Sequence, residues 1–453
     1  MDFVEHGIVY FADTAWTYLI YLLIGGGLFL LLYSRFIPFQ YFKHSIQILR
    51  GKYDNPDEIG DITHFQALVS ALAATIGMGN ISGVALAITV GGPGAMFWMW
   101  VSALVGIATK FFTCSLAIMY RGQDSAGKTQ GGPMYVTLKG LGSKWKPLAA
   151  FFCIAGVIGC LPLFQVNQLV QVIRDVVFAP MGVIGEDHFG FDFMAGITLV
   201  ALVSIVIFGG ITRIADVASR VVPAMVVLYM ACALWIILNN IEEVPKYLKL
   251  IIADAFTGEA VAGGAVGMVI MTGVRRAAFS NEAGIGTESL AHGAAKTREP
   301  SREGLVSMME PIIDTMIVCT CTALVILITG VWQTTSDNGV TLTANAFESA
   351  MPGFGSYVLI ICVVFFSTST IFTYSYYGTK CLGFLVGAKW QHLYNYFYVG
   401  CIIAASVASL DAAVSLIDGM FAMMAIPTMV STLLLSPKVM ASLQDYRKRQ
   451  KLK

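Results

Sequence analysis

Long hydrophobic runs separated by short polar stretches make up most of this chain. Eleven runs reach, or nearly reach, the roughly 20 residues that a membrane-crossing helix needs. They are residues 15–36, 66–91, 95–120, 148–178, 193–210, 217–239, 258–287, 304–332, 354–385, 392–410 and 412–436. Helices are the expected form because no water satisfies backbone groups in the bilayer core. The runs are too continuous for the short alternating strands of a membrane barrel.

Composition supports a lipid environment for these helices. The chain is 57% hydrophobic and 12% charged, with a mean hydropathy of +0.73, whereas soluble domains are about 25% charged. The net charge is zero, so the chain lacks the excess of positive charge that is typical of nucleic-acid-binding proteins. The nine cysteines lie in apolar stretches and are expected to pack as small hydrophobic side chains.

Basic residues are unevenly divided between the two sides that eleven spans define. With the N-terminus outside, most of the 28 Lys and Arg residues fall in inner loops, and the outer loops keep only Lys246 and Lys249. The positive-inside rule therefore predicts a multi-pass protein of the cell membrane with an outer N-terminus and a cytoplasmic C-terminus. The first run lacks the basic start of a signal peptide, so we expect it to be a real span.

Two of the runs are interrupted by glycines and polar residues. Residues 73–87 read AATIGMGNISGVALA, and residues 271–286 read MTGVRRAAFSNEAGIG. Close packing of small residues would explain the glycines. It does not explain Asn80 or the two arginines, since an ionisable group at that depth costs at least a few kcal/mol. We therefore predict that the helices unwind at Thr75–Asn80 and at Thr272–Arg276.

An unwound helix offers ligands for both charged ends of an amino acid. Its freed N–H groups suit a carboxylate, and its freed carbonyls suit an ammonium group or a cation. The two interrupted runs lie five spans apart, which is the pattern of inverted repeats in secondary transporters. The first run would then be a peripheral helix. This organisation divides the chain into an N-terminal segment with the peripheral helix and a cytoplasmic loop (1–62), a first five-helix repeat (63–240), a second, inverted repeat (241–436) and a basic cytoplasmic tail (437–453).

Two further runs carry polar groups that could complete a site. The first, LPLFQVNQ at 161–168, places a kinking proline before Gln165 and Gln168, which share a helix face as a candidate cavity wall, with Phe164 as an apolar lid. Interhelical hydrogen bonding is the alternative. The second, FFSTST at 365–370, has four consecutive hydroxyls.

Those hydroxyls suggest a sodium site, because hard cations take oxygen ligands. They would face freed carbonyls near Ala73 and Ile76. Bonding of each hydroxyl to its own helix is the alternative. The hydroxyl residues are Ser367, Thr368, Ser369 and Thr370.

Ionisable residues within the runs form a third group. Glu282 and Asp314 are candidates to pair with Arg275 or Arg276 as a gate or brace, although the arginines would also suit direct capture of a carboxylate. We favour the gate. Lys110 and Glu310 are expected near the membrane interface, where Lys110 can snorkel.

One stretch, GQDSAGKT at 122–129, matches the spacing of a phosphate-binding P-loop. It follows a membrane span rather than a buried strand, and its loop is too short for a nucleotide domain. We therefore do not assign it to nucleotide binding.

Several separated motifs resemble the alanine/glycine:cation symporter family over nearly the whole chain. They are GNISGVALAITVGGPGAMFWMW (79–100), GGPMY (131–135), FSNEAGIG (279–286), AHGAAKT (291–297) and the run from Asp314 to Leu327. The resemblance implies an all-α LeuT-type fold, with a ten-helix core of two inverted five-helix repeats plus one peripheral N-terminal helix. It also implies sodium-coupled uptake of alanine or glycine.

Three departures from the family pattern stand out. Met78 occupies a position where the family commonly has threonine, which bears on pocket size. The run after FSNEAG reads Gly286-Thr287-Glu288-Ser289 instead of Gly-Ser-Ala-Pro, and Thr113 replaces an acid three residues after Lys110. The last two departures bear on gating.

The leading hypothesis is a sodium:small-amino-acid symporter that works by alternating access. Backbone N–H groups near Gly77–Gly79 and the Asn80 amide would hold the substrate carboxylate. Gln165 or Gln168, with carbonyls near Thr272–Gly273, would hold the ammonium. Phe164 and Phe279 would limit side-chain size. The full set of predicted substrate-site residues is Thr75, Gly77, Met78, Gly79, Asn80, Phe164, Gln165, Gln168, Thr272, Gly273, Val274 and Phe279.

Three alternatives stay open at this point. A proton-coupled transporter on the same fold would need Glu282 or Asp314 at the ion site. A membrane enzyme would need a clustered nucleophile, base or metal set, but the six histidines are expected in loops or near span ends, so we expect no enzyme and no cofactor apart from Na⁺. An ion channel would give flux without accumulation. The ranking of alanine, glycine, serine and D-enantiomers, and the oligomeric state, stay open.

Overall fold

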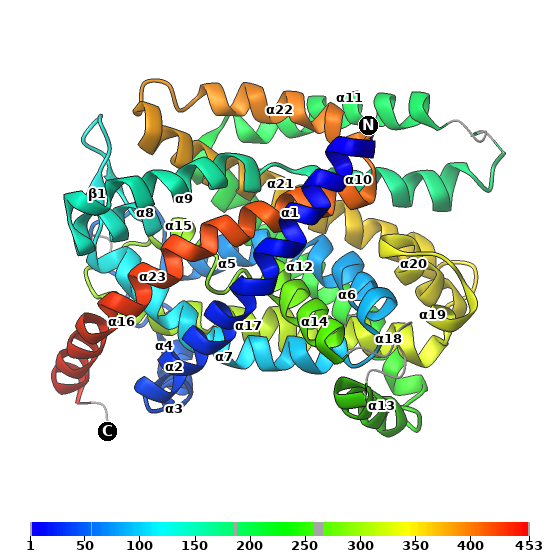
Figure 1. The fold of residues 1–453 in the computed structure, drawn as a ribbon, viewed down its shortest axis with the longest axis horizontal. Helices are drawn as coiled ribbons and strands as arrows, with labels where there is room; N and C mark the ends of the chain where they lie inside the picture. Colours follow the sequence, from blue (N-terminus) through cyan, green and yellow to red (C-terminus); the bar gives the residue numbers. More distant parts are fainter. Residues whose placement is uncertain (1, 56, 183, 185–187, 258–265, 452–453) are drawn as a thin grey trace.

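The computed structural model describes residues 2–451, except 56, 183, 185–187 and 258–265, and almost all of the described chain is helical (Figure 1). The helices, including short π and 3₁₀ turns labelled η, are α1 Asp2–Ile20, η1 Tyr21–Gly25, α2 Gly26–Tyr33, α3 Ile37–Gln40, α4 Phe42–Leu49, α5 His64–Thr75, α6 Met78–Gly91, α7 Ala95–Met119, α8 Pro133–Tyr135, η2 Val136–Leu141, η3 Ser143–Trp145, α9 Lys146–Gly159, α10 Leu163–Val172, η4 Ile173–Phe178, α11 Phe189–Ile207, α12 Gly210–Asn239, α13 Val244–Thr257, α14 Val266–Asn281, α15 Glu288–His292, α16 Pro300–Ser307, α17 Met309–Pro311, η5 Ile312–Cys319, α18 Thr320–Thr329, α19 Val331–Thr334, α20 Gly339–Ala350, α21 Gly355–Val386, α22 Leu393–Ser406 and α23 Leu410–Gln450.

These helices account for the eleven predicted runs. In the described part of the chain, nine helical stretches are long and apolar enough to cross a membrane, and α22 is a shorter apolar helix of 14 residues. The remaining run, 258–287, contains α14, and its residues 258–265 lie outside the described part. The boundaries differ from the predicted ones by a few residues, most at α23, which continues to Gln450.

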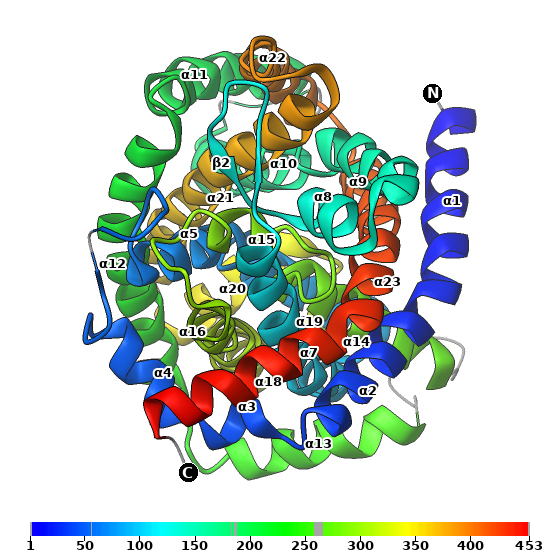
Figure 2. The ribbon, with the colours of Figure 1, turned by 90° about the vertical axis from the view of Figure 1, so that its left-hand side faces the viewer.

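Helices α5 and α6 form the centre of the molecule, and α1 lies at its edge. In the most apolar part of the α5–α6 stretch, 94% of the residues are buried inside the protein. In the most apolar part of the α1–α2 stretch, only 33% are buried. Figure 1 shows α1 crossing the front of the bundle next to α23, and Figure 2 shows it at the right-hand edge. The indole Nε1–H of Trp16 donates to the Asp418 carbonyl of α23 at 3.0 Å. The predicted peripheral position of the first helix is confirmed.

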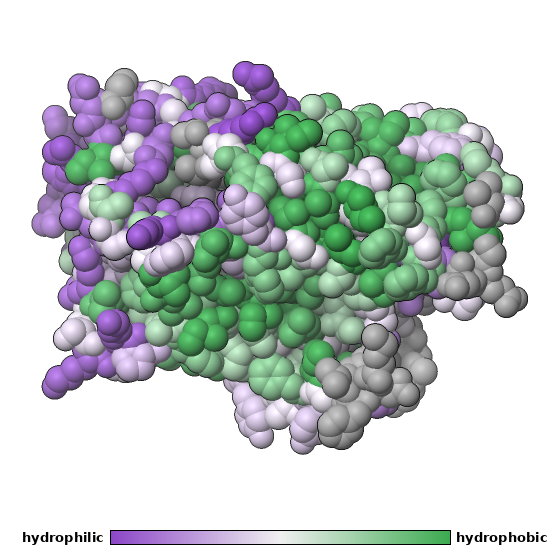
Figure 3. All heavy atoms as spheres, turned by 90° about the horizontal axis from the view of Figure 1, so that it is seen from above, coloured by the Kyte–Doolittle hydropathy of each residue, from purple (hydrophilic) through white to green (hydrophobic). Residues whose placement is uncertain are grey.

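The surface separates into a hydrophobic middle and a hydrophilic end. Figure 3 shows hydrophilic residues gathered at the left-hand end, where Figure 1 places strand β1 (Gly122–Gln123), α16 and the C-terminal part of α23. A broad hydrophobic surface lies next to it, as expected for the part of a membrane protein that faces lipid.

The P-loop-like stretch forms a hairpin at this hydrophilic end. Strands β1 (Gly122–Gln123) and β2 (Thr129–Gln130) pair antiparallel. One carboxylate oxygen of Asp124 accepts from the backbone N–H groups of Ala126 and Lys128 at 2.9 and 3.0 Å. The glycine and aspartate in this stretch therefore shape a turn, and the strand–loop–helix context of a nucleotide site does not occur here.

Candidate substrate and ion site

The first helix break lies where the sequence predicts it. Helix α5 ends at Thr75 and α6 begins at Met78, so Ile76 and Gly77 are unwound. The Gly77 N–H donates to the Asn80 side-chain oxygen at 3.0 Å. A Cβ atom at Gly77 would lie 2.4 Å from the Thr370 hydroxyl, so only glycine fits against α21 at this point.

The second break is displaced from its predicted position. Helix α14 runs without interruption to Asn281, so the prediction of an unwound segment at Thr272–Arg276 is wrong. The chain unwinds after Asn281 instead, where Glu282, Gly284 and Gly286 have positive φ angles of 56°, 85° and 98°. Such angles suit glycine and are uncommon for other residues.

Close packing explains why Gly273 does not break the helix. A Cβ atom there would lie 2.4 Å from the Ala95 carbonyl oxygen, so this glycine lets α14 approach α7. Thr272, Gly273 and Val274 precede Phe279 by five to seven residues, which places Thr272 about 10 Å away from it along α14. They lie apart from the first break, which is contacted by Phe279 and Ser280.

The end of α14 and the start of α6 meet around Asp314. A Cβ atom at Gly79 would lie 3.2 Å from the Ser280 Cα. The Asp314 carboxylate accepts from the Asn80 amide at 2.7 Å, the Ser280 hydroxyl at 2.6 Å and the Thr315 hydroxyl at 2.7 Å. Asp314 therefore joins the two broken helices and does not pair with an arginine, contrary to the gate hypothesis. Because Asn80 bonds through both ends of its amide, it shapes the break.

The four hydroxyls of α21 point in different directions. The Thr370 hydroxyl lies 3.0 Å from the Ala73 carbonyl of α5 and 3.1 Å from the Phe366 carbonyl of its own helix. The Ser369 hydroxyl lies 3.4 Å from the Ala73 carbonyl and 3.0 Å from that of Phe366. Thr368 donates to the Val364 carbonyl of its own helix at 2.7 Å and lines an apolar crevice between α12 and α21. The Ser367 hydroxyl is buried with no partner among the described residues. Two of the four hydroxyls thus face the first break.

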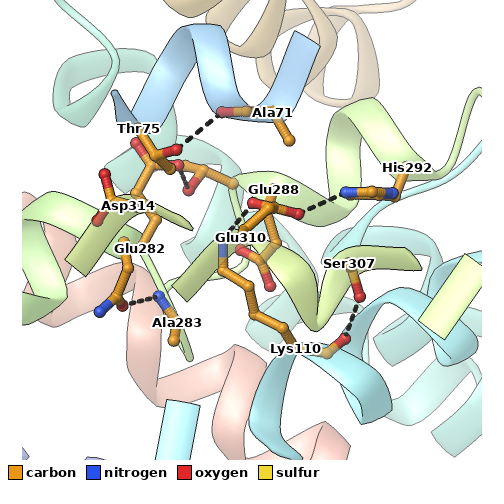
Figure 4. Close-up of polar contacts among 12 residues, drawn as sticks. Ala71, Thr75, Lys110, Glu282, Ala283, Glu288, His292, Ser307, Glu310 and Asp314 are labelled. Atoms are coloured by element: carbon orange, nitrogen blue, oxygen red, sulfur yellow. Dashed lines mark hydrogen bonds and ion pairs between the residues drawn. The ribbon is translucent and has the colours of Figure 1, made fainter. Parts of the chain in front are cut away.

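Other predicted residues of the first break are buried around it. Ile76 and Met78 are fully buried. The Thr75 hydroxyl donates to the Ala71 carbonyl of its own helix at 3.2 Å (Figure 4).

The two glutamines of the predicted cavity wall differ in the hydrogen bonds that their side-chain oxygens accept. A kink at Cys160–Pro162 divides α9 from α10, as Pro162 predicts. Gln165 is 3% exposed, and its carbonyl oxygen has no partner among the described residues. The Gln168 carbonyl, in contrast, accepts from the Ser82 hydroxyl and from the Val340 N–H of α20. Gln168 therefore anchors the α20 segment.

Two aromatic side chains cover the space beside the breaks. The rings of Phe164 and Phe279 lie 5.0 Å apart in an edge-to-face arrangement. Phe279 also touches the first turn of α6, because a Cβ atom at Gly79 would lie 3.4 Å from its ring. The Arg276 guanidinium lies 5.3 Å from the Phe279 ring centroid.

The two arginines pair with an aspartate that the sequence reasoning missed. Arg275 donates through Nε to Asp418 and through Nη1 to Asp13 of α1, each at 2.6 Å, and Arg276 also pairs with Asp418. These residues line a cavity of about 290 Å³ together with Thr272. The hypothesis that Glu282 or Asp314 pairs with the arginines is wrong. The sequence does mark Asp418 as unusual, because it is an acidic residue within the apolar run 412–436.

Glu282 lies instead at the second break. Its carboxylate accepts from the Tyr374 hydroxyl of α21 at 2.5 Å and from the Thr287 hydroxyl. Tyr374 follows Thr370 by four residues, so one face of α21 contacts both breaks. Nothing in the local sequence around Tyr374 indicated this contact.

Lys110 and Glu310 form a fully buried pair, so the prediction of an interfacial, snorkelling Lys110 is wrong (Figure 4).

Two of the three departures from the family pattern meet beside this pair. The Thr113 hydroxyl donates to the Glu288 carboxylate at 2.6 Å. The family pattern has an acid at position 113. In this chain position 113 is a threonine, and the carboxylate of Glu288 lies next to it.

Comparison with known proteins identifies the family. The model of the sodium:alanine symporter family matches residues 1–453. The sodium/alanine symporter AgcS of Methanococcus maripaludis is 39% identical over 96% of this chain and 95% of its own length. A probable sodium/glutamine symporter, GlnT of Bacillus subtilis, is 33% identical over 99% of this chain and 91% of its own length.

A solved structure supports the same fold. The crystal structure of MhsT in complex with L-phenylalanine matches with a TM-score of 0.52 and 12% sequence identity, covering 85% of this chain and 99% of the MhsT chain. The predicted fold class is therefore confirmed as an all-α membrane fold of the LeuT type. The chain belongs to the sodium:alanine symporter family and is a multi-pass membrane protein of amino-acid symport.

Proposed function

We propose that this protein couples the downhill entry of Na⁺ to the uptake of small neutral amino acids, alanine and glycine, by alternating access. The relatives named above are described as sodium/alanine and sodium/glutamine symporters. The proposal requires no cofactor and no catalysed reaction. Its orientation, with the N-terminus outside and the C-terminus in the cytoplasm, follows from the distribution of Lys and Arg.

The observation that carries the sodium part is the contact between α21 and the first break. The hydroxyl oxygens of Ser369 and Thr370 lie 3.4 and 3.0 Å from the Ala73 carbonyl oxygen, next to the unwound Ile76 and Gly77. A hard cation takes uncharged oxygen ligands of this kind. Ser369, Thr370 and the carbonyls of Ala73 and Ile76 would hold Na⁺, which would join the half-helix α5 to α21.

The substrate would lie beside the same break, at the start of α6. The first N–H groups of a helix have no partner within it, so those of Met78 and Gly79 suit a carboxylate. The buried, unpartnered carbonyl oxygen of Gln165 suits the ammonium group. Phe164 and Phe279, in contact with each other, would restrict the side chain to a small one.

The arginine–aspartate cluster would act as the outer gate. Arg275, Arg276 and Asp418 join α14 to α23, and α14 is the outer half of the second broken helix in the proposed orientation. Alternating access requires such contacts to break and re-form as the half-helices move.

Proton coupling on the same fold is less well supported. Its candidate carboxylates, Glu282 and Asp314, are each occupied by hydrogen-bond donors of the protein. Neither one contacts the Ala73 carbonyl. The α21 hydroxyls, which have no titratable proton near neutral pH, therefore favour Na⁺.

Equilibrium binding of labelled L-alanine to the purified protein tests the proposal. We expect saturable binding in NaCl that is lost when K⁺ replaces Na⁺, with unlabelled glycine competing and leucine competing poorly. Alanine binding of equal affinity in KCl, or binding that depends on pH and not on Na⁺, would contradict the proposed coupling.

A further inference from the structure

A chain of buried charged side chains crosses the inner half of the bundle. His64 contacts Glu303, Glu303 contacts His292, His292 contacts Glu310, and Glu310 contacts Lys110. None of these five side chains is more than 1% exposed. Figure 4 shows Glu310 between Lys110 and His292. In the described part of the chain, no three His, Cys, Asp or Glu side chains are arranged to hold a metal ion.

The contacts of His292 fix how many protons the cluster holds. Its Nδ1 lies 2.5 Å from Glu303 and its Nε2 lies 2.5 Å from Glu310. A neutral imidazole has one N–H and one lone pair, whereas an imidazolium has two N–H groups. Only the imidazolium can donate to two carboxylates at once. A neutral ring would place its lone pair against a carboxylate oxygen.

Charge balance leads to the same result. Lys110 and a protonated His292 together balance the carboxylates of Glu303 and Glu310. His64 can donate Nδ1–H to Glu303 as a neutral ring, because its Nε2 has no partner among the described residues. Loss of the His292 proton would leave a net buried negative charge, which is strongly unfavourable.

None of the other charged groups around His292 supplies the positive charge that its proton brings to Glu303 and Glu310. Glu288 lies on its own helix and, through Thr113, next to Lys110. Arg121 approaches from the end of α7, but its guanidinium donates to backbone carbonyls, among them that of Gly293 at 2.8 Å. The carboxylate of Glu282 is bonded to Thr287 and Tyr374.

The cluster links the inner halves of both broken helices. His64 is the first residue of α5, and His292 is the last residue of α15. The adjoining backbones also pair, with the Asp61 N–H donating to the Ala294 carbonyl at 2.8 Å and the Lys296 N–H to the Ile62 carbonyl at 2.6 Å. Glu303, Glu310 and Lys110 attach this assembly to α16, α17 and α7.

We infer that His292, held between Glu303 and Glu310, is a proton-binding site that closes the inner side of the transporter and is loaded from the cytoplasm. The bound proton keeps α15 attached to α16 and α17 through Glu303 and Glu310. Its release weakens this attachment, so inner opening becomes easier as cytoplasmic pH rises. The proton is not the coupling ion, because the site is separate from Ala73 and the α21 hydroxyls.

The protonation state can be observed directly in the wild-type protein. Solid-state ¹⁵N NMR of histidine-labelled protein in lipid at pH ~8.5, where ordinary histidines are neutral, should show one imidazole with both nitrogens protonated. Only neutral imidazoles under these conditions would overturn the inference, whether or not the protein transports alanine.

The functional consequence is a one-sided pH dependence. In right-side-out vesicles with a fixed sodium gradient and fixed external pH, uptake should stay level up to an internal pH of about 8.5, where the proton is still bound, and rise above it by at most about tenfold per unit, the limit for one proton. His292→Gln should flatten this dependence while keeping sodium-dependent alanine binding. The exposed His392 is the matched control, and His392→Gln should behave as wild type. An unchanged internal pH dependence in His292→Gln would also overturn the inference.

Discussion

Thr370 and Thr368 are the most informative pair of single residues. Both are hydroxyls on α21, but Thr370 reaches the Ala73 carbonyl of α5 as well as the Phe366 carbonyl of its own helix, whereas Thr368, among the described residues, bonds only within its own helix, beside an apolar crevice. If Na⁺ is held at Ala73, Thr370→Ala removes one ligand. We expect the Na⁺ concentration for half-maximal alanine binding to rise about tenfold or more, since a hydrogen-bonding or ligand contact to a charge is worth roughly 1.5–3 kcal/mol.

Thr368→Ala provides the control for that measurement. It removes the same group from the same helix, two residues away, and should leave the Na⁺ dependence unchanged. Equal shifts in the two variants would show that the effect is a general perturbation of α21 and would count against the site at Ala73.

At the residue scale, the sequence identifies unusual groups better than their partners. Arg275 and Arg276 stand out in a hydrophobic run, and they lie well inside the protein as expected. Their partner Asp418 lies more than 140 positions later, on a helix whose alignment with α14 depends on the whole fold. For the same reason, Glu282 and Asp314 were wrongly assigned to the arginines.

The contact of α14 with α23 and α1 leads to a prediction at the scale of elements. Asp418 is fully buried and binds both arginines, whereas Asp13 on α1 is 55% exposed and binds only Arg275. Removing one partner of a buried ion pair typically costs about 3–5 kcal/mol, and an exposed pair is worth at most about 1 kcal/mol. Asp418→Asn should therefore lower the thermal unfolding midpoint in detergent strongly, and Asp13→Asn only slightly.

The contrast between these two variants matters more than either value. A similar small shift in both would mean that the α14–α23 contact does not hold the described arrangement together. Trp16, which also bonds to the Asp418 backbone, is unaffected by either change and keeps α1 against α23.

At the element scale, the first break was predictable and the second was not. Gly77 lies in a short glycine cluster, and the close approach of Thr370 leaves no room for a Cβ atom there. The second run has glycines at 273, 284 and 286. Choosing among them requires knowing that Gly273 packs against Ala95 and that Gly284 and Gly286 have positive φ angles, and both facts depend on the tertiary structure.

At the scale of the whole molecule, hydrophobic periodicity and charge asymmetry are sufficient for the architecture. The eleven runs fall on helices, and nine helical stretches in the described part of the chain are long and apolar enough to cross a membrane. The hydrophilic end in Figure 3 holds β1, α16 and the C-terminal part of α23. The buried His–Glu–Lys cluster was not predicted. We expected the histidines in loops or near the ends of spans. His64 and His292 are indeed terminal residues of their helices, but both side chains are buried inside the protein.

The central claim is that sodium entry drives amino-acid accumulation. The most direct measurement is uptake of labelled alanine into proteoliposomes under an imposed inward Na⁺ gradient, compared with an inward proton gradient without Na⁺. The account predicts accumulation above the equilibrium level with the Na⁺ gradient alone, and none with the proton gradient alone. Accumulation driven by protons without Na⁺, or alanine entry that never exceeds equilibrium, would contradict it.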